Sequence, residues 1–91
     1  MPRIASFEGL VVKLYFNDHP PPHVHVYAGR IGRPGVQAAR ISIDTGEVID
    51  GQLALAKVAT VRAWCERHRE PLRADWRRAR INLHPIGRYD Q

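Results

Sequence analysis

The chain has 91 residues, 44% of them hydrophobic, which is enough for one small domain with one modest core. No apolar run approaches the ~18 residues of a membrane span, so we expect no membrane-embedded segment. The net charge is +5 with arginine dominating, which favours nucleic acid or an acidic protein surface as the partner. The single Cys65 and the lack of an apolar signal sequence predict a cytoplasmic location.

The start of the chain has the composition of short β-strands. Residues 4–7 form a first candidate strand and are followed by a turn at Glu8 and Gly9. Residues 10–16 are rich in β-branched and aromatic side chains, and every second residue is apolar. This second strand therefore supplies the best core-facing stripe of the sequence.

The most distinctive stretch places three of the five histidines around three consecutive prolines. Proline fixes φ near about −65° and has no backbone N–H, so Pro20, Pro21 and Pro22 are expected to form a stiff, extended arm. The arm follows Asp18 and His19. A preorganised segment of this kind suits recognition of a partner protein, and these five residues are the candidate partner-binding segment.

Strict alternation follows the prolines, over residues 23–28. Successive side chains of a strand point to opposite faces. Val24 and Val26 can therefore face the core, while His23, His25 and Tyr27 share the other face. We expect these imidazoles to be free of any packing role and to form a functional surface.

The rest of the first half continues as strands and turns. Residues 29–35 are a basic loop rich in glycine, and residues 36–43 form another strand, with Arg40 on its polar face. A turn at residues 44–47 leads to a short return strand at residues 48–49. The first half is therefore predicted to be a small antiparallel meander.

The second half is predicted to be helical. Residues 52–69 carry apolar side chains at helical spacing, and Asp50 is placed to cap this helix. Pro71 fits the first turn of a second helix, which ends near Arg80. Residues 82–91 have no clear period and are expected to form a flexible tail.

These elements predict a single α+β domain over residues 1–91, with the sheet covered on one face by the two helices. Cys65 falls on the apolar stripe of the first helix, which favours a buried small hydrophobe over a nucleophile. His68 and His84 are expected at the surface. The predicted buried residues come from both halves of the chain: Leu10, Leu14, Val24, Val26, Ile41, Val58, Val61, Trp64, Cys65 and Trp76.

Arginines recur along the second helix, where most of the excess positive charge lies. Phosphate contacts by arginine would give weak, salt-sensitive binding to RNA or DNA. A solvated helix face is the alternative interpretation of the same pattern. The candidate nucleic-acid-binding residues are Arg73, Arg77, Arg78 and Arg80.

Taken together, these motifs resemble the domain-of-unknown-function 4160 family of small bacterial proteins. The resemblance covers nearly the whole chain, and its most specific part is the proline–histidine block. The residues that carry it are Met1, Pro2, Ile4, residues 15–26, residues 43–47, Trp64, residues 68–70, Leu72 and Trp76. The loop at residues 29–35 looks longer than is typical of the family, and Arg77 and Arg78 make the last helix more basic.

The resemblance implies a component of a toxin–antitoxin-type module. Members of this family are found beside members of the domain-of-unknown-function 2442 family, so the expected partner is a protein of that type encoded nearby. The resemblance carries over no catalytic residues. It leaves open whether the chain is toxin or antitoxin.

Three kinds of chemistry fit the histidine face. In the first, two histidines act as general acid and base on RNA, as in a metal-independent ribonuclease, with His23, His25, Tyr27 and Arg40 as the catalytic candidates. In the second, His19, His23 and His25 bind a transition metal, with Asp18 as an alternative third ligand. In the third, which we favour, the face is a recognition surface that needs no cofactor.

Overall fold

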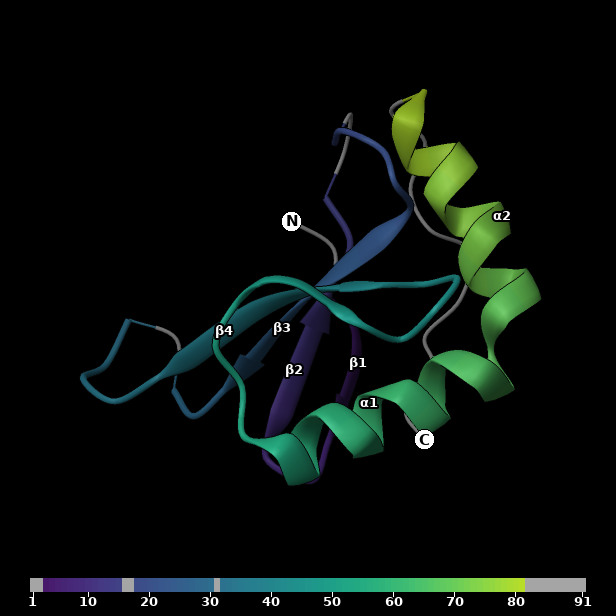
Figure 1. Ribbon diagram of the computed structural model, residues 1–91. Coiled ribbons are helices and arrows are strands. Elements are labelled where there is room, and N and C mark those ends of the chain that lie inside the picture. The colour runs from purple at the N-terminus through teal and green to yellow at the C-terminus, as the bar shows by residue number, and fades with distance from the viewer. Residues whose placement is uncertain (1–2, 16–17, 31, 82–91) are drawn as a thin grey trace.

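The computed structural model describes residues 3–15, 18–30 and 32–81. The chain folds into a five-stranded antiparallel sheet followed by two helices, which confirms the predicted α+β class (Figure 1). No helix among these residues is long and apolar enough to cross a membrane. The elements are β1 (Arg3–Phe7), β2 (Leu10–Lys13), β3 (His23–Ala28), β4 (Gln37–Ser42), β5 (Val48–Gly51), α1 (Leu55–Arg67) and α2 (Arg69–Arg80).

The strand order across the sheet follows the chain order, so each strand pairs with the next one as a meander. The alternation predicted for β3 is confirmed, because Val24 and Val26 are fully buried. Val26 lies between Val12 of β2 and Ala39 of β4, and both of these neighbours are also buried. One face of the sheet therefore carries the apolar core.

Helix α1 packs on this apolar face. Its Val61, Trp64 and Cys65 are fully buried, and the Trp64 ring lies 5.6 Å from the ring of Phe7 in β1. Burial raises the pKa of the Cys65 thiol to about 12, which agrees with its predicted role as a small core residue. Of the ten residues predicted to be buried, Val58 is only partly so.

Helix α2 lies at one end of the sheet, where it rises away from α1 (Figure 1). Arg69 donates a hydrogen bond to the carbonyl oxygen of Ile43, which directly follows β4. The Trp76 ring lies 5.0 Å from the ring of His23, the first residue of β3. The second helix therefore covers the sheet end at which the proline segment enters β3.

Several predicted boundaries were wrong. The first helix begins at Leu55, with Ala54 rather than Asp50 at its N-cap position, because Asp50 lies in β5 and pairs with Arg40. The helices divide at His68, which leaves Pro71 in the first turn of α2 as expected. The chain bends at Pro20 and Pro21, so the predicted extended arm is not formed. The predicted tail, residues 82–91, lies outside the described residues.

Gly51 provides a test of the β4–β5 pairing. Its φ is +89°, and a Cβ atom there would lie 2.3 Å from the carbonyl oxygen of Ala38 and 2.7 Å from the Cα of Ala39. Gly35 has a similar φ of +85° but nothing within 4 Å of such an atom. Both alanine variants incur about 1–2 kcal/mol of backbone strain, and only Gly51→Ala also clashes with β4.

We therefore expect Gly51→Ala to lower the free energy of unfolding by about 1–3 kcal/mol more than Gly35→Ala does. Urea denaturation followed by tryptophan fluorescence measures both. Equal losses in the two variants would contradict the close approach of β5 to β4.

Candidate functional site

A row of polar side chains crosses the face of the sheet opposite the apolar core. Lys13 of β2 is the register partner of His25 of β3, and His25 is in turn the partner of Arg40 of β4. Arg40 is opposite Asp50 of β5. Directly opposed residues of neighbouring strands project from the same face, so these four side chains form one continuous line.

Asp18 joins two histidines beside this row. Its Oδ2 atom lies 3.0 Å from Nε2 of His23 and 2.8 Å from Nε2 of His25. The other ring nitrogen of His23, Nδ1, donates a hydrogen bond to the carbonyl oxygen of Pro21 at 2.7 Å. The bend at the prolines thus brings a carboxylate back onto the strand that follows them.

The environment of Asp18 favours its ionised form. Burial alone raises the pKa of a carboxyl group, but the hydrogen bonds from His25 and from the backbone N–H of His19, together with the nearby imidazoles, bring the pKa of Asp18 below its usual value. Arg80 of α2 donates a hydrogen bond to the backbone carbonyl of Asp18. Asp18 is therefore a negatively charged centre held by both the sheet and the second helix.

Two tyrosines extend the polar face along the strands. The hydroxyl groups of Tyr15 and Tyr27 lie 2.7 Å apart, and the Tyr15 ring meets the His25 ring edge-on at a centroid distance of 4.3 Å. Nζ of Lys13 lies 5.7 Å from the centre of the Tyr27 ring. Burial, the hydrogen bond and charge repulsion from Tyr27, and the charge of Asp18 raise the pKa of Tyr15 to about 12, so this phenol stays protonated at neutral pH.

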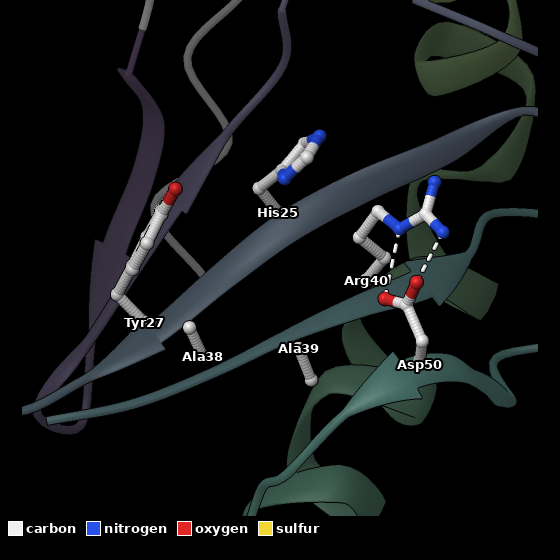
Figure 2. A pocket seen from close by; sticks show the side chains of 6 residues that line it. All are labelled: His25, Tyr27, Ala38, Ala39, Arg40 and Asp50. Carbon is white, nitrogen blue, oxygen red and sulfur yellow. Dashed lines mark hydrogen bonds and ion pairs between the residues drawn. The ribbon is translucent and has the colours of Figure 1, made fainter.

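A pocket opens beside the row of polar side chains, between β3, β4 and β5. Figure 2 shows the side chains of His25, Tyr27 and Arg40 rising from one side of the sheet, with Arg40 joined to the carboxylate of Asp50. This pairing raises the pKa of Arg40 and lowers that of Asp50. The pocket lining consists of His25, Tyr27, Ala38, Ala39, Arg40 and Asp50.

Three of the four catalytic candidates line the pocket, and the fourth is buried. His25, Tyr27 and Arg40 line the pocket, whereas His23 is only 1% exposed and does not. The prediction that both imidazoles are free of a packing role is wrong for His23, because Trp76 of α2 covers its ring. Strand alternation places a side chain on a face but does not say which other element covers that face.

The predicted metal ligands are rearranged in a similar way. His19 is exposed, and the group that meets His23 and His25 is its neighbour Asp18, the alternative ligand. Sequence spacing allowed either residue, because the choice depends on the direction of the bend at Pro20 and Pro21. Of the proposed partner-binding segment, His19, Pro20 and Pro21 are exposed.

The arginines of α2 are largely engaged with the rest of the fold. Arg73 forms ion pairs with Asp44 at 2.6 Å and with Glu70 at 2.8 Å, and Arg80 contacts Asp18 as described above. Binding of nucleic acid by the arginines of this helix stays a prediction.

His68 is partly buried, with its ring 5.7 Å from that of Trp64, so its predicted surface position was wrong. Burial and the nearby Arg67 lower the pKa of His68. His84 lies outside the described residues.

Fold and site together define a small α+β domain whose polar sheet face carries an aspartate–histidine cluster. The chain belongs to the family described as domain of unknown function (DUF4160), whose model matches residues 9–77. This match includes the proline–histidine block, the polar row and most of α2. Searches of the curated proteins and of the solved structures found no match.

The different positions of the three histidines predict different costs of their removal. His23→Ala removes a buried ring and leaves the Pro21 carbonyl without its donor, at a cost of about 1–3 kcal/mol for the lost hydrogen bonding alone. His25→Ala loses one bond at a partly exposed position, so its effect should be smaller. His19→Ala is the matched control, because an exposed side chain contributes within about 0.5 kcal/mol.

Urea denaturation of the three variants should therefore rank the losses as His23 first, His25 second and His19 last. A His23→Ala protein as stable as the His19→Ala protein would show that Trp76 does not hold the imidazole in a buried position.

Proposed function

We propose that this protein binds single-stranded RNA on the polar sheet face, as one component of a bacterial toxin–antitoxin-type module. The observation that supports this proposal is the register of Lys13, His25 and Arg40 on three neighbouring strands, with Tyr27 beside them. Positively charged side chains bind the phosphate backbone, and an aromatic ring on an open sheet gives a base a surface for stacking.

The ion pair between Arg40 and Asp50 on this face can be replaced by a contact between Arg40 and an RNA phosphate. Asp50 holds the guanidinium of Arg40 in a two-pronged ion pair near the surface. The planar guanidinium can donate two parallel hydrogen bonds to a phosphate as it does to a carboxylate, so a phosphate can compete with Asp50 for Arg40. Lys13 has no ion pair with any residue in the described part of the chain and contributes its charge directly.

Binding without cleavage fits this geometry better than ribonuclease chemistry. A two-histidine mechanism needs both imidazoles to reach the ribose and its phosphodiester. The side chain of His23 is 0% exposed, and both of its ring nitrogens have partners. Of the two histidines, only His25 is exposed enough to contact a bound RNA.

We expect RNA binding to depend on which of the two lysines is changed. Lys13 lies in the polar row, whereas Lys57 lies on α1 and donates to the carbonyl oxygen of Glu8. Lys13→Gln should weaken binding of a short labelled RNA and reduce the salt slope by about one. Lys57→Gln, with the same change of charge, should leave both unchanged. Fluorescence anisotropy at several salt concentrations, with EDTA present, measures the affinity and the salt slope of both variants.

Arg77→Gln tests the second helix as the alternative surface. Arg77 is exposed and lies in the last turn of α2. If this variant weakens binding and Lys13→Gln does not, the RNA contacts the helix and our proposed face is wrong.

Tyr27→Ala should weaken RNA binding as Lys13→Gln does, since stacking contributes about 1–3 kcal/mol per base.

The proposed module has a consequence for growth. The expected partner is a protein of the domain-of-unknown-function 2442 type, and the exposed His19, Pro20 and Pro21 are the proposed contact. Expression of one of the two genes alone, the toxin, should slow bacterial growth, and expression of both together should restore it. If neither gene affects growth, alone or together, a toxin–antitoxin role is contradicted.

A further inference from the structure

Three groups with metal-binding capacity converge at the start of β3. One ring nitrogen of His23, one of His25 and a carboxylate oxygen of Asp18 all lie within 4.8 Å of one another, and Nε2 of each histidine faces Oδ2 of Asp18. They come from two different parts of the chain, the segment before the prolines and the strand after them. The bend at Pro20 and Pro21 brings them together.

The hydrogen bonds of His23 determine which of its nitrogens can bind an ion. Nδ1 lies 2.7 Å from the carbonyl oxygen of Pro21, which only accepts, so Nδ1 carries a hydrogen atom. In neutral His23 the lone pair is then on Nε2, and it faces the carboxylate oxygen of Asp18 at 3.0 Å. Two lone pairs at this distance repel each other unless a cation, either a proton or a metal ion, lies against both.

This arrangement is the one that metal-binding histidines commonly show. The far ring nitrogen donates to a backbone carbonyl, which fixes the tautomer and aims the other nitrogen at the ion. Two ligands at about 2.0–2.1 Å from one ion are about 2.9 Å apart at the right angle of an octahedral site and about 3.3 Å apart at the tetrahedral angle that zinc prefers. The two nitrogen–oxygen distances are 3.0 and 2.8 Å.

We propose that Asp18, His23 and His25 form a binding site for one divalent transition-metal ion. Two imidazoles and one carboxylate favour ions such as zinc or iron(II) over magnesium or calcium, which prefer oxygen ligands. His23 anchors the ion from the buried side. The side chains of Asp18 and His25 are 20% and 23% exposed, so the ion keeps positions that face solvent.

The open side of this site adjoins the pocket described above. His25 belongs to both, since it is a ligand of the proposed ion and part of the lining next to Arg40. His25 thus links the proposed ion to the pocket that Arg40 lines. The metal site shares His25 with the proposed RNA-binding face, so the RNA-binding test contains EDTA and the two proposals can fail separately.

Calorimetric titration of tag-free, EDTA-dialysed protein with zinc chloride tests the site. We expect one ion per chain, and no comparable heat with magnesium chloride. His25→Ala and Asp18→Asn should each weaken zinc binding by at least about tenfold, as the loss of a ligand exceeds the effect of losing its supporting hydrogen bond. These two ligands are partly exposed, so their variants are the ones expected to fold.

His19→Ala is the matched control, because it removes a neighbouring exposed imidazole that lies outside the cluster. It should bind zinc like the unaltered protein, and zinc should raise the thermal midpoint of both but not that of His25→Ala. If zinc gives no more heat than magnesium, the cluster is an imidazolium–carboxylate group and the proposal is wrong. It is equally wrong if His19→Ala loses as much affinity as His25→Ala.

Discussion

The candidate site depends on one shared acceptor, the Oδ2 atom of Asp18, which meets the ring nitrogens of both His23 and His25. An isolated buried imidazole would cost free energy, because its polar nitrogens would lose their water. Here Pro21 and Asp18 replace that water for His23, and α2 closes over the ring with Trp76. The bend at the prolines, the start of β3 and the second helix are thus held together by the same small group of contacts.

The two histidines of β3 differ in exposure because different parts of the fold surround them. Both project from the same face of β3, but His23 is at the end that α2 covers and His25 is one step further along the open sheet. His23 is therefore fixed by packing, whereas the ring of His25 is partly exposed beside the pocket.

Sequence reasoning predicted the local pattern of this protein well and its tertiary contacts less well. The bounds of β3 and the burial of Val24 and Val26 follow from strand alternation, which depends only on neighbouring residues. The roles of Asp18 and Asp50 depend on which segments meet in space. A carboxylate before a proline bend can turn toward the strand or away from it, and nothing in the spacing of the residues decides between these directions.

Helix α2 is joined to α1 through His68 alone, and any opening of this helix must expose its buried Leu72, Trp76 and Ala79. Because α2 contacts His23 and the Asp18 backbone, opening of the helix depends on whether the Asp18–His23–His25 cluster is held in place. Whatever engages His23 or Asp18 will therefore slow amide hydrogen exchange along α2, although no side chain of α2 belongs to the cluster. Hydrogen exchange along α2 would thus report binding of the proposed ion, and a partner that binds α2 would influence the cluster by the reverse route.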